Sequence, residues 1–223
     1  MQYRHEWKHE INASDLLALR QRLTAVAKPD PHAAGGSYQI RSLYFDTPAD
    51  RALREKLDGV NRREKFRIRC YNGDTSFIRL EKKSKWNGLC AKESVCITEK
   101  ETAALLTGDT LWMNDPARPL LADFRYKLQT QRLQPKTLVD YTRDAYTYAP
   151  GNVRVTLDYH IRTALTCTDF LDARCVTIPA GGAAIILEVK WDAFLPDVIR
   201  DTVQLTGRHT AAFSKYAACR TYG

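Results

Sequence analysis

Charged side chains occupy every second position in several segments that otherwise have the composition of β-strands. In KFRIR, Arg67 and Arg69 alternate with apolar side chains, and in LEVKW the same is true of Glu188 and Lys190. Three further segments repeat the pattern, namely FIRLEKK, RVTLD and the N-terminal YRHEWKHE. Because successive side chains of a strand point to opposite faces, each segment has one apolar face and one charged face.

Two interpretations of the charged faces are open. An ordinary antiparallel sheet presents polar faces to solvent, and for one strand taken alone this reading is sufficient. Across the set, however, arginine dominates over the threonine, serine and glutamine that are usual on a solvated sheet. Like charges two residues apart on one strand repel unless an anion lies between them. Five such strands in one chain therefore predict a closed or deeply curved sheet lined with cations, whose ligand is strongly anionic.

Local patterns place helices and turns between the strands. Asn12 or Ser14 can cap a helix over 15–27, and Thr98 with Glu101 forms a capping box for another. Further helices are expected at 49–59, 115–131 and 196–205. Strands are expected at 3–11, 40–47, 63–74, 76–85, 91–97, 137–147, 152–163 and 183–191, with a hairpin turn at 72–74. This order predicts an α+β fold, a mostly antiparallel closed β-barrel or tunnel of about eight strands with helices packed outside.

Composition limits the size and the partners of the protein. The chain of 223 residues is 44% hydrophobic, enough for a buried core, and residues 1–223 are most simply one domain. The net charge of +8 implies an acidic partner such as phosphate chains, nucleotides, nucleic acid or an anionic membrane, without choosing among them. No segment approaches the roughly 18 apolar residues that span a bilayer, and no signal peptide is evident. A cytoplasmic location is therefore expected.

Several common kinds of catalytic or metal site lack their motifs. The chain has no phosphate-binding glycine loop, no dinucleotide-binding glycine motif, no H-E-x-x-H and no G-x-S-x-G. The six cysteines and five histidines have no zinc-like spacing, and without an export signal the cysteines are interpreted as reduced thiols. What remains is a collection of arginines and lysines with a few acids, which suits phosphate groups and a divalent cation.

The charged segments and their neighbours resemble a known family. The chain contains, in order, RHEWKHEI, SLYFDT, EKLDG, REKFRIRCY, RLEKKSKWNG, YTRDAY, RVTLD, ILEVKW and FSKY, and the set is similar to the VTC domain. That domain is the catalytic polyphosphate polymerase domain of the vacuolar transporter chaperone complex and its bacterial relatives, within the CYTH-like triphosphate tunnel metalloenzyme superfamily. The resemblance extends from Arg4 to Tyr216 and fits the bacterial stand-alone form. It implies a tunnel of antiparallel strands, in agreement with the charged faces.

The resemblance also implies functional residues at the matching positions. The phosphate and ATP ligands would be Lys8, Lys56, Arg67, Arg69, Lys83, Lys92, Arg154, Lys190 and Lys215. Of these, Arg67, Arg69, Lys83, Arg154 and Lys215 would be catalytic, and Glu188 would bind Mn²⁺ or Mg²⁺. Tyr44, Lys82 and Arg143 are candidates of second rank. Glu81 and Asp158 are interpreted as partners of basic residues, and Asp46 as the partner of a tunnel base or as a support for the following turn.

The implied reaction is transfer of the ATP γ-phosphate to a polyphosphate chain by a metal-dependent enzyme of the polyphosphate kinase type. Arginines would neutralise the charge of the transition state while the metal ion bridges and orients the phosphates. The attacking phosphate is already ionised, so no protein base is required. This fits a chain that offers no evident histidine or cysteine catalyst.

Two alternatives keep the same tunnel. If water is the acceptor, the protein would be a tripolyphosphatase or nucleoside triphosphatase. If it has no turnover, the protein would be a polyphosphate-binding subunit. Nucleic acid is not expected as a partner, because aromatic residues are not interleaved as a stacking platform. Eukaryotic catalytic subunits carry an additional lysine where this chain has Ala211 and Ala212, which implies one phosphate contact fewer. Their sensor and membrane segments are not found in this sequence, so product export would need a separate membrane protein.

Overall fold

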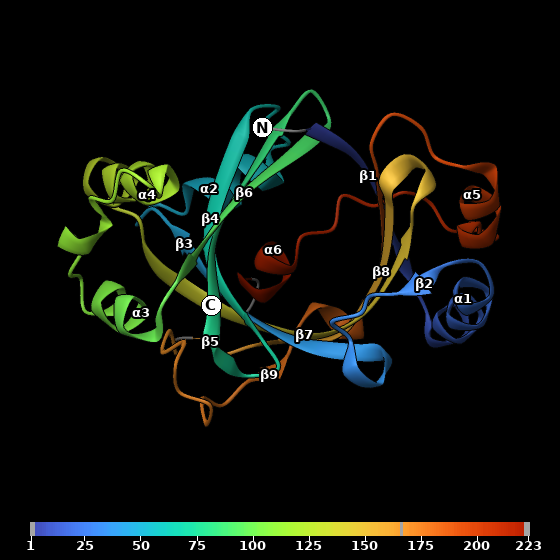
Figure 1. Cartoon of the computed structure of the whole chain (residues 1–223), viewed down its shortest axis with the longest axis horizontal. Coiled ribbons are helices and arrows are strands. Elements are labelled where there is room, and N and C mark those ends of the chain that lie inside the picture. The colour runs from blue at the N-terminus through green and yellow to red at the C-terminus, as the bar shows by residue number, and fades with distance from the viewer. Residues whose placement is uncertain (1–2, 166, 221–223) are drawn as a thin grey trace.

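The computed structural model describes residues 3–165 and 167–220, and its strands form one antiparallel sheet (Figure 1). The strands are β1 (Tyr3–Ile11), β2 (Lys28–Pro29), β3 (Ser37–Asp46), β4 (Arg63–Tyr71), β5 (Asp74–Trp86), β6 (Leu89–Ile97), β7 (Gln134–Tyr148), β8 (Val153–Thr163), β9 (Ile178–Pro179) and β10 (Ile185–Trp191). Eight of them follow the order β7-β3-β4-β5-β6-β1-β10-β8, and pairing of β8 with β7 closes the barrel. The predicted closed antiparallel barrel is confirmed, and the short β2 and β9 extend it beside β7 and β8.

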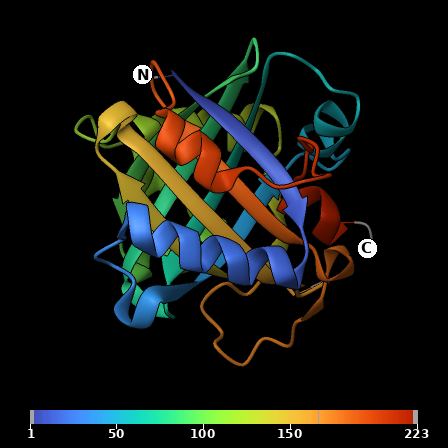
Figure 2. The same ribbon diagram turned by 90° about the vertical axis from the view of Figure 1, so that its right-hand side faces the viewer.

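Helices cover two sides of the barrel and lie at one end of it. The helices are α1 (Ala13–Val26), α2 (Arg51–Leu57), α3 (Glu99–Leu106), α4 (Pro119–Thr130), α5 (Asp197–Val203) and α6 (Lys215–Arg220). Figures 1 and 2 show α1 and α5 together outside β8 and β10, whereas α3 and α4 lie on the opposite side of the barrel. Within the described residues, no helix has the length and apolar character needed to cross a membrane. The fold is α+β, as predicted.

On the two sides that the helices cover, apolar side chains of the strands pack outward against them. Leu19 of α1 and Ile199 of α5 join a buried cluster with Val189 of β10. On the opposite side Phe124 of α4 stacks on Phe66 of β4, with the ring centroids 5.0 Å apart. The alternation that directs these residues outward turns the intervening charged residues toward the barrel axis. The charged strand faces therefore surround one interior, and the interpretation as solvent faces is wrong.

Local capping and turn chemistry agrees with the sequence expectations. The Asn12 side chain accepts a hydrogen bond from the backbone N–H of Asp15 at 2.8 Å and so caps α1. Thr98 and Glu101 form the reciprocal capping box at the start of α3. In the hairpin turn at 72–73 both residues have positive φ, 52° and 71°, the backbone that an Asn-Gly pair favours. These elements are fixed by local sequence.

Besides the short strands β2 and β9, which were not predicted, two helices differ from the expectation. The helix expected at 115–131 begins only at Pro119, because the preceding residues form a turn in which the Arg118 N–H donates to the Asp115 carbonyl at 3.0 Å. Proline has no N–H to lose at the first helical position, so it favours this later start. The short helix α6 was not predicted at all.

The helix α6 divides the interior into a charged part and an apolar part. Tyr216 stacks on Tyr44 with ring centroids 5.0 Å apart, and Cys219 joins Val139 and Ile161 in a buried cluster. These contacts close off one region of the barrel from water. They also carry Lys215, the first residue of α6, to the edge of the charged region.

The carboxylate of Asp46 connects α6 to the start of α2. It is 1% exposed and accepts hydrogen bonds from the backbone N–H groups of Thr47, Ala52 and Leu53 at 2.8, 2.8 and 3.1 Å. The Tyr216 hydroxyl donates to the same carboxylate at 2.8 Å. Of the two roles considered for Asp46, the structure therefore shows the support of the turn.

Replacing Asp46 by alanine should reduce the free energy of unfolding by about 3 kcal/mol, because several buried donors lose their acceptor together. Tyr216→Phe removes only one of these bonds and should reduce it by about 1 kcal/mol. Urea unfolding of both variants checks the difference. An Asp46→Ala variant no less stable than Tyr216→Phe would contradict this role.

Candidate functional site

The charged part of the barrel interior is a cavity of about 340 Å³. Eleven lysine and arginine side chains line it, against the two carboxylates of Glu6 and Glu188. The cations are Arg4, Lys8, Lys65, Arg67, Arg69, Lys83, Lys92, Arg143, Arg154, Lys190 and Lys215. This excess of positive charge in a confined space favours a ligand that carries several negative charges.

The structure brings together nearly all the residues that the sequence nominated. Eight of the nine nominated phosphate ligands line the cavity, as does Glu188. The second-rank candidates Tyr44 and Arg143 also line it. Lys56 lies outside, on α2, and lines an adjoining cavity. Lys82 points away from the interior, and its Nζ lies 2.6 Å from the Asp123 carboxylate.

Two buried carboxylates hold the arginines of the cavity wall in place. Glu81, 1% exposed, accepts a hydrogen bond from Arg67 Nε at 2.8 Å, and its other oxygen lies 3.0 Å from Lys92 Nζ. Asp158, 0% exposed, accepts from Arg143 Nε at 2.6 Å and from Lys215 Nζ at 2.5 Å. Neither acid lines the cavity, so both act as partners of basic residues.

The electrostatics of these pairs keep both acids ionised. Burial alone would raise the pKa of Asp158, but Arg143 and Lys215 outweigh it and lower that pKa to about 2. Burial likewise opposes ionisation of Glu81, and Arg67 with its neighbouring cations holds the pKa of that carboxyl well below its usual value. The carboxylates therefore stay charged at neutral pH, and they fix the arginine geometry before any ligand arrives.

Tyrosine and serine hydroxyls complete the positioning of the two β4 arginines. Arg67 Nη1 donates to the Tyr44 hydroxyl at 2.8 Å. Arg69 is 4% exposed; its Nε donates to Ser42 Oγ at 3.0 Å and its Nη2 to the Tyr141 hydroxyl at 2.8 Å. Tyr141 was not singled out from the sequence. Its place two residues before Arg143 on the same strand face is the pattern that could have identified it.

The two carboxylates that line the cavity lie side by side on β1 and β10. Lys8 Nζ lies 3.2 Å from Glu6 and 3.3 Å from Glu188, and Lys190 Nζ lies 3.0 Å from Glu188. Burial and the charge of Glu188 raise the pKa of Glu6, but Lys8, Lys83 and Lys190 lower it more, to about 2. Both acids therefore remain anionic among the lysines.

This pair of acids fits a divalent cation that is shared with a phosphate ligand. Mg²⁺ is usually held by one or two carboxylates together with phosphate oxygens rather than by an all-protein cage. No group of three or more His, Cys, Asp or Glu residues suited to a metal occurs in the described chain. Glu188 and Glu6 are the two acids of the cavity wall that such an ion could use.

Lys65 is a cavity residue that the sequence reading missed. Of the eleven cations, it alone forms no ion pair with a carboxylate among residues 3–165 and 167–220. It lies opposite Lys83 in the β4–β5 register, and its Nζ is 5.3 Å from the Tyr44 ring centroid. The alternation of Arg67 and Arg69 extends back to Lys65 in REKFRIR, and this pattern could have identified it.

The pKa values of Lys65 and Tyr44 reflect the unbalanced positive charge. Burial, together with repulsion from Lys83, Lys8 and Arg67, lowers the pKa of Lys65 to about 7. Burial raises the pKa of Tyr44, but Arg67, Lys65 and other cations lower it more, to about 7. An anion bound between these groups would relieve both effects.

A closed antiparallel barrel with a cationic interior and a pair of wall carboxylates defines a tunnel protein for highly charged phosphate compounds. The VTC domain family model matches residues 3–222, so the chain belongs to the VTC domain family. No curated protein sequence matches the chain. The resemblance inferred from the ordered segments is confirmed.

Several solved structures have the same fold. Three of them are a candidate adenylyl cyclase from Hippeastrum described as having a dominant triphosphatase activity, the protein PH1012 from Pyrococcus horikoshii, and a candidate adenylate cyclase from Bacillus halodurans. Their TM-scores are 0.55, 0.54 and 0.52, each with 14% identity. The alignments cover 100%, 96% and 85% of this chain and 96%, 98% and 80% of those chains. At this identity the likeness shows the fold alone.

Lys65→Met should stabilise the ligand-free protein and weaken binding of tripolyphosphate. Removing a buried lysine that has no carboxylate partner among the described residues and is repelled by Lys83, Lys8 and Arg67 should raise the unfolding free energy by about 1 kcal/mol, or Tm by about 2–4 °C. Lys83→Met is the matched control: its Nζ pairs with Glu6 at 2.8 Å, so its removal should lower Tm. Thermal unfolding with and without tripolyphosphate measures both effects. A lower Tm for Lys65→Met in the absence of ligand would contradict the unpaired state of this lysine.

Binding of tripolyphosphate at pH 8.5 should be accompanied by proton uptake. With pKa values of about 7, Lys65 and Tyr44 are mostly deprotonated at this pH, and a bound anion raises both values and restores their protons. Calorimetric titration in buffers of different ionisation enthalpy measures the uptake. It should fall in Lys65→Met and in Tyr44→Phe. Equal uptake in wild type and both variants would show that other groups bind the protons.

Proposed function

We propose that the protein transfers the γ-phosphate of ATP to the end of a polyphosphate chain inside the barrel. Membership of the VTC domain family and the cationic cavity support a tunnel enzyme that acts on triphosphate or polyphosphate compounds. The observation that favours chain extension is that the cavity continues into a second cavity at the barrel end beside α2. A product longer than a triphosphate therefore has space to continue along the same axis.

The wall residues would supply positioning and charge neutralisation. Arg67, Arg69 and Arg143 are held by buried partners and present their remaining N–H groups toward the cavity, where nonbridging oxygens would lie. Fixed donors of this kind stabilise charge in the transition state without reorganising during the reaction. In a loose phosphoryl transfer, positioning and neutralisation supply most of the catalysis.

Glu188 and Glu6 would hold Mn²⁺ or Mg²⁺ together with phosphate oxygens of the substrate. Such an ion supplies Lewis-acid neutralisation of the transferred group. The Lys8 and Lys190 ammonium groups, which bind these carboxylates in the structure, would turn to phosphate oxygens. The exchange would leave Glu6, Glu188, Lys8 and Lys190 each with a partner of opposite charge.

The reaction needs no protein base. The bond between the γ-phosphorus and the bridging oxygen of ATP breaks, ADP leaves with that oxygen, and a terminal oxygen of the chain forms the new bond. That terminal oxygen is already ionised near neutral pH, so no proton has to be removed. Accordingly, no histidine side chain other than His5 lines the cavity within the described residues.

A hydrolytic function is the second candidate. The Hippeastrum protein of the same fold is described as having a dominant triphosphatase activity. Water in place of the acceptor phosphate would give that outcome with the same wall residues. The two reactions differ in product, since hydrolysis yields free phosphate and transfer yields longer chains.

Incubation with ATP and Mn²⁺ or Mg²⁺ should give ADP and long polyphosphate chains, resolved by gel electrophoresis. Glu188→Gln should reduce the rate by at least about 100-fold, because the metal loses a charged ligand. Glu188→Asp keeps the charge and should retain part of the activity, and the Tm values of both variants test for intact folding.

Free phosphate as the sole product would overturn the polymerase proposal in favour of hydrolysis. Tight binding of polyphosphate without turnover in any divalent metal would instead indicate a binding subunit. Unchanged activity in a folded Glu188→Gln variant would remove this residue from the metal site.

A further inference from the structure

The cationic cavity continues toward the barrel end beside α2. A second cavity of about 430 Å³ adjoins it there and shares six lining residues with it, namely Glu6, Lys8, Lys65, Lys83, Cys90 and Ser214. α2, the start of β4, the end of β5 and residues 210–214 surround this second cavity, which we call the α2 mouth. A linear ligand that fills the interior can therefore continue into the α2 mouth.

The α2 mouth has three cations that lie outside the catalytic interior. Lys56, Arg63 and Lys85 line it, and none of them forms an ion pair with a carboxylate in the described part of the chain. Arg63 donates a hydrogen bond to the backbone carbonyl of Val60. Burial and repulsion from Arg63, Lys8 and Lys85 lower the pKa of Lys56, which shows that these charges are close enough to interact.

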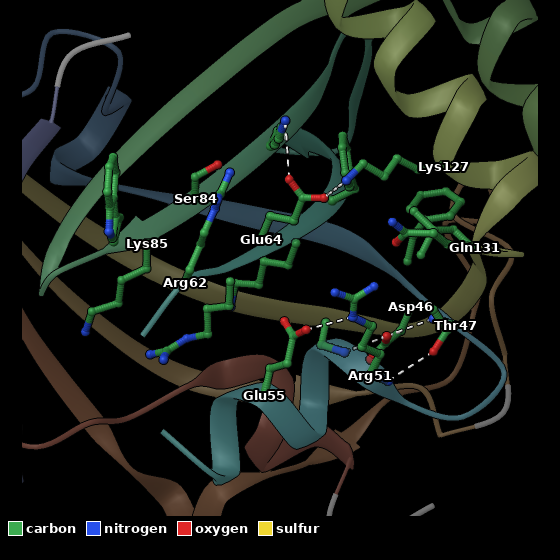
Figure 3. A pocket seen from close by; sticks show the side chains of 18 of the residues that line it. Asp46, Thr47, Arg51, Glu55, Arg62, Glu64, Ser84, Lys85, Lys127 and Gln131 are labelled. Carbon is green, nitrogen blue, oxygen red and sulfur yellow. Dashed lines mark hydrogen bonds and ion pairs between the residues drawn. The ribbon is translucent and has the colours of Figure 1, made fainter. Parts of the chain in front are cut away.

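Acids near the α2 mouth are bound to other cations. Glu55 of α2 accepts a hydrogen bond from Arg51 at 2.7 Å, and Glu64 of β4 pairs with Lys127 of α4. Figure 3 shows these pairs in the pocket between α2, β4 and α4, with Lys85 extending away from them. The positive charge of the mouth therefore remains available to an anion.

A surface pocket beside β7 and β8 also shares residues with the interior. Arg4 and Arg154 line both the cavity and this pocket. Arg4 Nε lies 2.7 Å from Asp192, and Arg154 Nη2 lies 2.8 Å from Asp30. The two arginines shared with this pocket therefore have carboxylate partners, whereas Lys56, Arg63 and Lys85 at the α2 mouth have none among the described residues.

We propose that Lys56, Arg63 and Lys85 form a second polyphosphate-binding site, which holds the chain where it passes through the α2 mouth. Polyphosphate carries a charge on every unit, so the part that extends beyond the interior still needs cations. Lys65 and Lys83 lie in both cavities and link the two sites. The identity of the polyanion rests on the proposed function, but the site does not depend on whether the chain is being lengthened or hydrolysed.

Chain-length-dependent binding tests this site. The double variant Arg63→Gln/Lys85→Gln should bind long-chain polyphosphate at least about 10-fold more weakly than wild type, with a smaller dependence of affinity on salt, because fewer counterions are released. Tripolyphosphate is short enough for the interior, and its affinity should change less than twofold. Calorimetric titration at several salt concentrations measures both ligands.

The matched control is Arg22→Gln/Lys100→Gln, which removes the same charge from the exposed surfaces of α1 and α3. It should bind both ligands as wild type does. Equal long-chain affinity in the two double variants would overturn the second site, as would an equal loss of affinity for tripolyphosphate and long chains in the mouth variant. Arg63→Lys/Lys85→Arg keeps the charge and should restore long-chain binding.

Polymerase assays separate this proposal from the proposed function. If wild type makes long chains while the mouth variant matches the control in long-chain affinity, the second site fails and the polymerase stands. If wild type only hydrolyses polyphosphate yet the mouth variant loses long-chain affinity, the second site stands and the polymerase fails.

Discussion

Repulsion among cations inside the barrel is the constraint on which the rest of the structure depends. Eleven lysine and arginine side chains share one cavity of about 340 Å³, and without compensation their mutual repulsion would oppose closure of the barrel. Four carboxylates reduce this repulsion. Glu81 and Asp158 bind cations without lining the cavity, whereas Glu6 and Glu188 bind them at the cavity surface. Each acid contacts at least two cations, so a few carboxylates stabilise a much larger positive charge.

This arrangement divides the acids by accessibility. Glu81 and Asp158 do not line the cavity, so a phosphate ligand cannot meet them and they remain bound to their arginines. Glu6 and Glu188 face the cavity, so under the proposed function their lysine partners would exchange a carboxylate for a phosphate oxygen. The geometry of the arginines is preorganised and the lysines remain adaptable, which would suit a chain that moves after each of the proposed transfers.

Four cations of the two cavities have no carboxylate partner in the described part of the chain. Lys65 in the interior and Lys56, Arg63 and Lys85 at the α2 mouth form no ion pairs with carboxylates of the described residues. Lys65 lines both cavities, and of these two cavities the other three cations line only the α2 mouth. Buried or crowded cations without partners destabilise a fold unless an anion joins them. A polyanion bound at the proposed second site would therefore stabilise these cations.

Much of this protein could be read from the sequence, because strand alternation and capping are local. KFRIR and LEVKW determined which side chains share a face, and Asn12 and Thr98 determined where helices begin. The number of strands and the closed barrel followed from the same pattern. Sequence could not decide that α4 starts only after Arg118, where a turn competes, or that α6 exists, which tertiary packing of Tyr216 stabilises.

Only the tertiary structure decided which charges meet. Sequence alternation placed Lys83 on the inward charged face but left Lys82 as a candidate of second rank, and the structure pairs Lys82 with Asp123 outside the interior. It could not show that Lys65 lacks a carboxylate, or that Lys56 lies at the mouth rather than within the interior. The sequence by itself determined the faces of the strands and the family. Closure of the barrel determined the pairing of charges, because those contacts join strands that are distant in the chain.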